Sequence, residues 1–334
     1  MNFQLKSLML GLSVIMTVTT GVASAGKDKT VKGPMKFDPI SGSATVLTDD
    51  WEQPHIIPEG FRMYKVSDET DLNIYTDNPN PTKTIERDMP DLTDMNSVNE
   101  TGRKKGRFLY RTHEVDNGGS IFKFIADHRG DLSSGTLYAL KLTGLTEEEQ
   151  TYGSTHPHTG PFEWVALDRD QVQIDAKVAA DMVNATEFGR PEDVEAIEHI
   201  LYVAETSQDR VLAIDLERNI LTAFVTKDDN APGGDENPNF NNPDNLAEGP
   251  EGRLWIVEDT KGSDIWVADY DRNHDGKADP VYQFAATVDS GAEGTGIYFG
   301  KDPHTLFVNV QHAAKEYADG TWVITNREAK KKEH

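Results

Sequence analysis

Four polar residues stand at turns or strand ends in three successive stretches of the chain, and three of them are carboxylates. They are Glu192, Asn245, Glu258 and Glu293, with Asp244 as an alternative to Asn245. If these positions converge in space, their negative charges repel one another unless cations lie between them. The pattern predicts a site for calcium or for several metal ions. The alternative is that each acid caps its own turn or is solvated in a loop.

Arg190 lies two residues before Glu192 and adds a second kind of chemistry. A guanidinium is always charged, and its planar fork of donors matches the oxygens of a phosphate or a carboxylate. Metal ions together with an arginine clamp are the minimum equipment for hydrolysis of a phosphate ester. Arg190 and Glu192 are therefore the candidate catalytic pair. The alternative is an internal ion pair from Arg190 to Asp193 or Glu195.

A second group of metal-ligand candidates lies between residues 269 and 279. Oxygen side chains at alternate positions, with a glycine that lets the chain curl back, suit a calcium ion with six to eight oxygen ligands. The candidate ligands are Asp269, Asp271, Asn273, Asp275 and Asp279. The twelfth position from Asp271 is Tyr282, so the bidentate glutamate of an EF-hand is missing. Because the flanking segments favour strands, we predict a structural calcium loop at a hairpin tip, with a plain acidic turn as the alternative.

The elements that must position these residues are short strands in a repeat. Three apolar runs contain Leu201, Leu254 and Leu306, which are spaced by 53 and then 52 residues. A period near fifty with several short strands per repeat is typical of a β-propeller. Like positions of successive blades converge on one axis in that fold. We therefore expect an all-β protein, a β-propeller, with one external helix over residues 173–186, where apolar residues recur at helical spacing.

The N-terminus has the features of a secretory signal peptide over residues 1–25. Lys6 precedes an apolar run from Leu8 to Val18, and Ala23-Ser24-Ala25 is a cleavage site. The run is shorter than the roughly 20 residues that span a bilayer. We expect a periplasmic or secreted protein without membrane insertion. Residues 26–105 are expected to form an N-terminal arm and polar loops that join the first blade or close the last sheet, 106–326 the propeller, and 327–334 a charged tail.

The charge of the chain narrows the class of partner. There are 57 acidic residues against 33 lysines and arginines, and the net charge of −24 becomes −25 when the signal peptide takes its one lysine away. Such a protein is repelled by nucleic acid and by anionic membranes. The sequence has no cysteine, so disulfides cannot stabilise it outside the cell. We expect the hydrophobic core and bound metal to stabilise the folded protein instead.

Five segments carry a resemblance to a known family: Arg190-Pro191-Glu192, Pro243-Asp244-Asn245-Leu246, Leu254-Trp255-Ile256-Val257-Glu258, Glu293-Gly294-Thr295-Gly296 and Leu306-Phe307-Val308-Asn309-Val310-Gln311-His312. With them the chain resembles the PhoX-type alkaline phosphatases of bacteria, mainly over residues 106–142 and 188–312. The resemblance implies an exported, six-bladed propeller whose central site carries calcium and iron ions. It also implies hydrolysis of phosphate monoesters.

The resemblance further implies roles for individual residues. Glu192 would be a metal ligand, Arg190 would bind phosphate, and the further metal ligands would be Glu258, Glu293, Asn245 and, on an earlier blade, Glu114. The family's iron centre uses a cysteine ligand, which this chain lacks. We therefore expect calcium as the cofactor rather than iron.

Three functions are compatible with these features. The first is an exported metal-dependent phosphatase acting on small phosphate monoesters. The second is a calcium-binding propeller that binds a small ligand or a partner without catalysis, which the missing cysteine and the short chain favour. The third is a calcium-dependent hydrolase of the lactonase type.

Overall fold

The computed structural model of the chain describes residues 31–44, 46–68, 93–98, 108–113, 119–128, 131–227, 240–300, 302–315 and 319–326. The predicted signal peptide (1–25), the charged tail (327–334) and Glu114 lie outside these residues. Across the described ranges, none of the helices has the length and apolar character needed to cross a bilayer.

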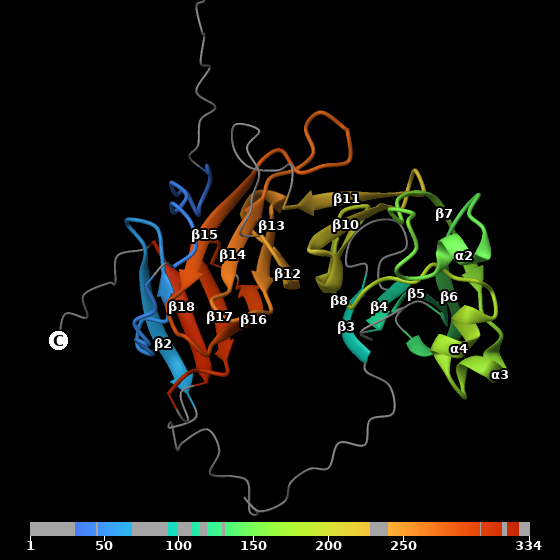
Figure 1. Cartoon of the computed structure of the whole chain (residues 1–334), viewed down its shortest axis with the longest axis horizontal. Helices are drawn as coiled ribbons and strands as arrows, with labels where there is room; N and C mark the ends of the chain where they lie inside the picture. The colour runs from blue at the N-terminus through green and yellow to red at the C-terminus, as the bar shows by residue number, and fades with distance from the viewer. Residues whose placement is uncertain are drawn as a thin grey trace, which may run out of the picture.

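The described strands form three antiparallel sheets (Figure 1). The largest has nine strands in the order β3 (Thr93–Val98), β4 (Phe108–His113), β5 (Ser120–His128), β6 (Asp131–Leu142), β7 (Gly160–Ala166), β11 (Ile220–Thr226), β10 (Arg210–Asp215), β9 (Ile200–Glu205) and β8 (Pro191–Ile197). The second comprises β1 (His55–Ile56), β15 (Val281–Thr287), β14 (Asp264–Ala268), β13 (Leu254–Glu258) and β12 (Pro243–Glu248). The third comprises β16 (Glu293–Phe299), β17 (Thr305–Gln311), β18 (Gly320–Thr325) and β2 (Arg62–Asp68).

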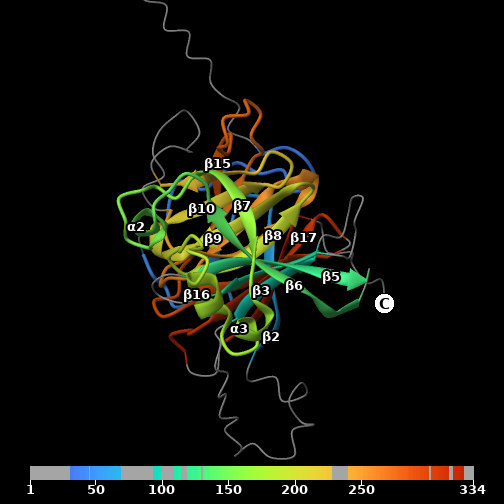
Figure 2. The ribbon, with the colours of Figure 1, turned by 90° about the vertical axis from the view of Figure 1, so that its right-hand side faces the viewer.

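These sheets consist of four-stranded units, as the repeat predicts. The described units are β3–β6, β8–β11, β12–β15 and β16–β18 with β2, and β7 joins the first two into one sheet. Leu201, Leu254 and Leu306 all lie in the second strand of a unit, at β9, β13 and β17. The first strands are neighbours, since β12 contacts both β8 and β16. The fold is therefore all-β and propeller-like, as predicted, and the units follow one another around one axis in Figure 1, which Figure 2 shows from the side. The expected number of six blades stays a prediction.

The buried side chains explain why each unit needs its neighbours. One core cluster joins the second and third sheets through Trp255, Phe284, Ile297 and Trp322. Another lies between β8–β11 and β12–β15 and contains Phe224, Ile256 and Trp266. A strand that is apolar on both faces is stable only between two layers, so the strands must assemble as a stack around the axis.

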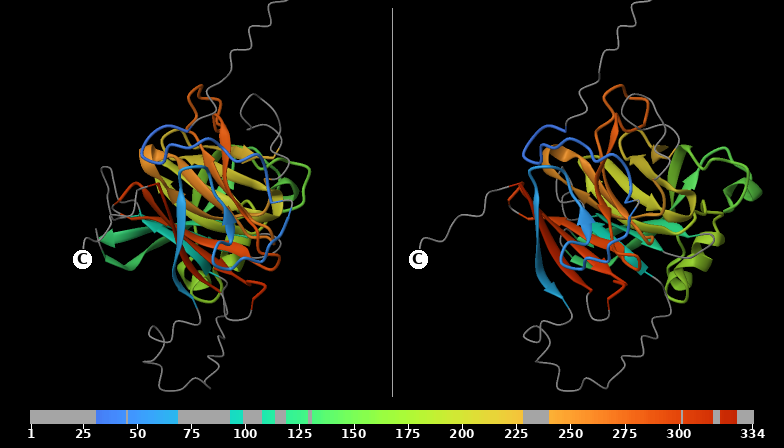
Figure 3. Two further views of the ribbon diagram at one scale, coloured as in Figure 1. Left: turned by 90° about the vertical axis from the view of Figure 1, so that its left-hand side faces the viewer. Right: turned by 60° about the vertical axis from the view of Figure 1, so that its left-hand side comes forward.

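The N-terminal region closes the last sheet. β2 runs antiparallel to β18, with Met63 opposite Ile324, so a strand from the start of the chain completes the unit made by its end (Figure 3). The preceding arm also enters the core, because Phe37 packs edge-on against Phe284, with ring centroids 5.0 Å apart. This pairing joins the two ends of the described chain by backbone hydrogen bonds.

The prediction of one long external helix over 173–186 is wrong in its extent. The structure has α3 (Arg169–Val172) and α4 (Ala176–Asp181), in addition to α2 (Glu147–Gln150) and the 3-10 turns Thr206–Gln208 and Pro250–Gly252. The side chain of Asp175 accepts a hydrogen bond from the Val178 amide at 3.0 Å, so a new helix starts there. Ile174 is therefore 78% exposed, while Ala179 and Ala180 are buried beside Phe122.

Because β2 completes the last sheet, we predict that replacing two adjacent residues of β2 by alanine lowers the free energy of unfolding by unequal amounts. Met63 is 4% exposed within the core, whereas Tyr64 is 44% exposed on the other face of the strand. We expect Met63→Ala to lower the free energy of unfolding by about 2–5 kcal/mol, and Tyr64→Ala by less than about 1 kcal/mol. Urea unfolding followed by tryptophan fluorescence measures both. Equal effects would mean that β2 does not contribute to the core.

Candidate functional site

Three first strands and their partners bring the predicted residues to one edge of the propeller. The pairs at this edge are Pro191 with Glu205, Pro243 with Glu258, and Glu293 with Gln311. Each joins the start of the first strand of a unit to the end of the second. The repeat therefore places these polar positions at equivalent points around the axis.

Arg190 lies at the centre of the contacts at this edge. Its Nη2 atom is 2.5 Å from Glu192 Oε1 and 3.0 Å from Asp259 Oδ2, and Asp259 directly follows β13 of the next unit. The side chain is 26% exposed, so part of the guanidinium reaches solvent. The alternative pairing of Arg190 with Asp193 or Glu195 stays a prediction. The guanidinium bridges carboxylates from two units.

Glu192 is held from several sides. It is buried, and the Thr206 hydroxyl lies 2.6 Å from its Oε2 atom and 2.7 Å from the Pro243 carbonyl oxygen. The Thr112 hydroxyl also donates to the Glu192 carbonyl oxygen. A buried carboxylate is stable only with a cation or donors beside it. Arg190 and Thr206 provide these and fix the direction of the Glu192 carboxylate.

Glu293 extends the group towards the third sheet. The Gln311 amide donates to its Oε1 atom at 2.7 Å, and His312 Nε2 is 3.2 Å from the same oxygen. Burial raises the pKa of Glu293, and the nearby negative charge of Asp259 raises it further, against the effect of the Gln311 hydrogen bond. Asp259, which contacts Arg190, and Glu293 are thus two acids that lie close together.

Asp259 is a member of the site that sequence reasoning missed. It stands one residue after Glu258, the position assigned to the metal cluster. Side chains alternate along a strand, so of two consecutive acids at a strand end only one faces a given side. This alternation could have indicated Asp259 as a second candidate. Which of the two acids faces the site depends on the register of β13.

Glu258 faces the interior instead. Its Oε1 atom accepts from the Asn241 amide and the Trp266 indole, each at 2.8 Å, and its Oε2 atom accepts from the Asp264 amide at 3.0 Å. Burial, followed by the charge of Asp264, raises its pKa well above the ordinary value. Glu258 holds the connection between β13 and β14, and its assignment as a metal ligand stays a prediction.

Asn245 joins two units. Its Oδ1 atom accepts from the Thr295 hydroxyl at 3.0 Å and from the Gly296 amide, both on β16. Gly296 has a left-handed φ of 42°, and a side chain there would clash with Asn309. The Asn245 oxygen therefore has a structural role that locks β12 to β16. Its assignment as a metal ligand stays a prediction.

The segment 269–279 forms the tip of the β14–β15 hairpin, as expected. Asp271 accepts from the backbone amides of Asp275 and Gly276, at 3.1 and 2.7 Å, and Asn273 accepts from that of Asp275 at 2.9 Å. Asp269 is different, because it is buried and its carboxylate contacts Arg253 and Arg272. The loop is closed by its own backbone donors, and calcium binding by Asp271, Asn273, Asp275 and Asp279 stays a prediction.

The fit of this site to a metal can be judged from the donor atoms. Within the described ranges, no group of three or more histidine, aspartate and glutamate side chains is arranged to hold a metal ion. The carboxylates around Arg190 are hard oxygen donors of the kind that calcium takes, and the chain has no sulfur from cysteine. The donor chemistry suits calcium, while the cation in direct contact with Glu192 and Asp259 is Arg190.

The sequence matches the family model of the alkaline phosphatase PhoX over residues 98–314. The matched part is 217 residues (314 − 98 + 1), well over half of the chain. The chain therefore belongs to the PhoX alkaline phosphatase family, and its function is phosphatase-like. Among curated proteins, none matches the sequence significantly.

Several solved structures are similar at low identity. A luciferin-regenerating enzyme is 11% identical, with 70% of this chain and 78% of that chain covered and a TM-score of 0.31. A PQQ-bound aldose sugar dehydrogenase from Streptomyces coelicolor is 12% identical, with 66% and 75% covered and a TM-score of 0.29. A virginiamycin B lyase from Staphylococcus aureus is 12% identical, with 79% and 99% covered and a TM-score of 0.25.

The buried Asp264 carboxyl is expected to make the protein less stable as pH rises. Burial raises the pKa of Asp264 to about 6, against hydrogen bonds that lower it. Below the ordinary aspartate pKa both folded and unfolded states are protonated. As pH rises from about 4 to about 6, the unfolded state loses its proton first, so this group's contribution to stability falls.

We expect Asp264→Asn to remove this fall in stability with rising pH, because an asparagine side chain does not titrate. The variant should be more stable than the wild type by about 1–3 kcal/mol at pH 7.5 and similar to it at pH 4. Urea unfolding at both pH values measures the difference. Asp170→Asn on the exposed side of α3 is the matched control and should change neither value. A wild type that gains stability relative to Asp264→Asn as pH rises would contradict the assignment.

Proposed function

We propose that this protein is an exported, metal-dependent phosphatase that hydrolyses phosphate monoesters at the edge formed by Arg190, Glu192, Asp259 and Glu293. The observation that carries the proposal is the position of the Arg190 guanidinium, 2.5 Å from Glu192 and 3.0 Å from Asp259, on two adjacent units. Membership of the PhoX family supports the reaction class. The predicted signal peptide supports export.

Arg190 is the residue that would bind the phosphate. Its fork presents several N–H donors in one plane, and two carboxylates keep that plane in a fixed orientation. Fixed donors need no reorganisation as charge develops on the transferred phosphoryl group, so they stabilise the transition state more than water does. The partial exposure of Arg190 gives a small ester access to it from solvent.

The carboxylates are the residues that would hold calcium. Glu192, Asp259 and Glu293 carry three negative charges against one on Arg190, so the group has a net charge of −2 when all are ionised. A phosphate ester is itself an anion and would be repelled unless cations reduced that charge. When bound, calcium would supply charge neutralisation and polarise the phosphate oxygens. His312, 3.2 Å from Glu293, lies where it can exchange a proton with that carboxyl.

Replacing Arg190 tests the phosphate-binding role. We expect Arg190→Ala to lower kcat/KM for p-nitrophenyl phosphate by about 10²–10³, the usual cost of removing a transition-state donor. Arg190→Lys should recover only part of the loss, because the charge remains but the fork does not. Arg169→Ala, on the exposed start of α3, is the control and should leave kcat/KM unchanged. Full activity of Arg190→Ala would refute the role.

Removal of divalent cations tests the metal requirement. We expect turnover to be lost after dialysis against a chelator and restored by calcium. Glu293→Gln removes one carboxylate near Asp259 and should raise the calcium concentration needed for half-maximal activity by about tenfold. Activity that persists unchanged in chelator would contradict metal dependence and leave the family assignment intact.

A second candidate is a propeller that binds calcium and a ligand without catalysis. It is favoured by the two carboxylates that already contact Arg190, because they compete with a phosphate for the same donors. This function predicts a calcium-dependent rise in Tm and no turnover of phosphate esters. The third, a lactonase-type hydrolase, predicts turnover in a panel of lactones instead.

A further inference from the structure

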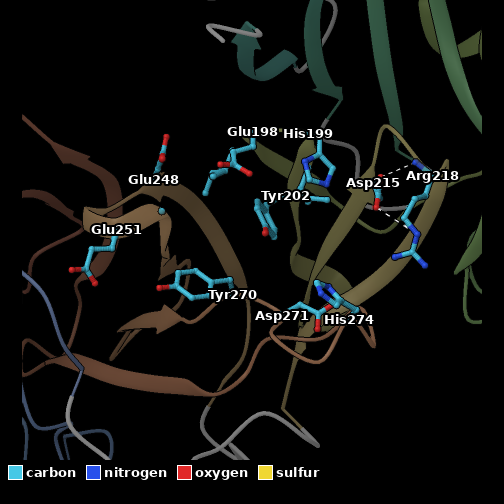
Figure 4. A pocket seen from close by; sticks show the side chains of 13 residues that line it. Glu198, His199, Tyr202, Asp215, Arg218, Glu248, Glu251, Tyr270, Asp271 and His274 are labelled. Atoms are coloured by element: carbon cyan, nitrogen blue, oxygen red, sulfur yellow. Dashed lines mark hydrogen bonds and ion pairs between the residues drawn. The ribbon is translucent and has the colours of Figure 1, made fainter. Parts of the chain in front are cut away.

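A pocket of about 590 Å³ lies at the edge opposite Arg190 (Figure 4). β8 begins next to Arg190 and ends at Ile197, and the turn from Ile197 to Ile200 lines the pocket. The turns of β10–β11, β12–β13 and β14–β15 line it too. The pocket therefore lies between two units, on the other side of the propeller from the proposed phosphatase site.

The lining of this pocket is acidic. Five carboxylates face it, against one arginine, Arg218, and the two histidines His199 and His274. The acids are Glu198, Asp215, Glu248, Glu251 and Asp271. With neutral histidines the formal charge of the lining is −4, from five acids and one arginine. A negative potential of this kind attracts cations and repels phosphate esters.

Some of these acids are already neutralised. Glu251 lies 2.9 Å from Arg253, and Asp215 is 3.9 Å from Arg218 and caps its own turn. Glu198 makes no ion pair within the described ranges. Asp271 accepts only backbone amides in the hydrogen bonds described above. Glu198 and Asp271 thus lie on either side of the pocket as charged acceptors from two different units.

Tyr202 lies between these two acids. Its side chain is 9% exposed, and it lines the pocket at the base of the β8–β9 hairpin. Burial, then the charges of Asp271 and Glu198, raise the pKa of the phenol, so it stays neutral at physiological pH. Among the described residues, its hydroxyl has no hydrogen-bond partner. The ring is nearly buried while the hydroxyl can be reached from the pocket, so a ligand or a water can supply the missing hydrogen bond.

A smaller apolar recess opens from the same place. It has a volume of about 80 Å³ and shares Ile200, Tyr202 and Asp271 with the larger pocket. Ala213, Ile220 and Phe224 supply its apolar wall. A ligand that fills both parts must have a polar, positively charged end and a short hydrocarbon end.

We propose that this pocket binds a small organic cation of the protonated alkylamine class. The ammonium group lies between Glu198 and Asp271 and donates a hydrogen bond to the Tyr202 hydroxyl. The tyrosine ring adds a favourable contact with the cation, and the hydrocarbon chain enters the apolar recess. This site is separate from the Arg190 edge, so it does not rest on the phosphatase function.

Calorimetric titration of the full chain with n-butylammonium chloride at low salt and pH 8 tests the proposal. We expect saturable binding of n-butylammonium, and binding at least about tenfold weaker for 1-butanol and for butyrate, which have the same chain without the positive charge. Tyr202→Phe and Glu198→Gln should each weaken binding by about tenfold or more, because the first removes an acceptor for the ammonium and the second removes a negative charge beside it.

Two conservative variants elsewhere serve as controls. Tyr298→Phe on the exposed face of β16 and Glu163→Gln on the exposed side of β7 make the same chemical changes outside the pocket, and binding should be unchanged. The Tyr202 ring packs against Phe224, with centroids 4.8 Å apart, so loss of the hydroxyl alone preserves the core. No saturable binding, equal binding of 1-butanol, or unchanged affinity in both pocket variants would overturn the proposal.

Discussion

The contact that organises the proposed site is the double ion pair of Arg190. One guanidinium contacts a buried carboxylate of its own unit and a carboxylate of the next, at 2.5 and 3.0 Å. Without that cation, several acids gathered at one edge would repel one another in a poorly solvated place. The same contact makes Arg190 a structural tie between units, and in the proposed function it also orients the donor group that would bind phosphate. Stability at this edge and the proposed function thus depend on the same side chain.

Both edges of the propeller carry an excess of acidic groups, but these groups are arranged differently. At the first edge Arg190 is held by acids, and at the second a tyrosine hydroxyl and five carboxylates surround a pocket of about 590 Å³. Both arise from the same repeat, because the starts of the first strands meet at one edge and the turns that follow them meet at the other. The two proposed sites therefore lie at opposite edges of the propeller and would take different ligands.

The fold and part of the site could be predicted because they depend on local pattern. The leucine spacing identified the repeated strand. Glu192 and Glu293, predicted from their places at turns or strand ends, and Arg190, predicted from its place beside Glu192, lie at one edge of the propeller. Asp259 was missed in favour of Glu258, since only the register of β13 decides which of two adjacent acids faces outward. The prediction of one long helix over residues 173–186 is wrong for a local reason as well. Asp175 competes for the backbone amides and starts a new helix, which periodicity of apolar residues does not reveal.

By itself the sequence determined the class of fold, the PhoX family membership and the chemical types of the site residues. These follow from strand periodicity and from motifs that are continuous in the chain. Only the tertiary structure decided which acids share a cation, which ones turn into the core, and where the acidic pocket lies. Those outcomes depend on residues more than fifty positions apart that the fold brings together, such as Arg190 with Asp259 at one edge and Tyr202 with Asp271 in the lining of the pocket. Strand register and the packing of neighbouring units determine which residues meet, and neither can be predicted from a single segment of the sequence.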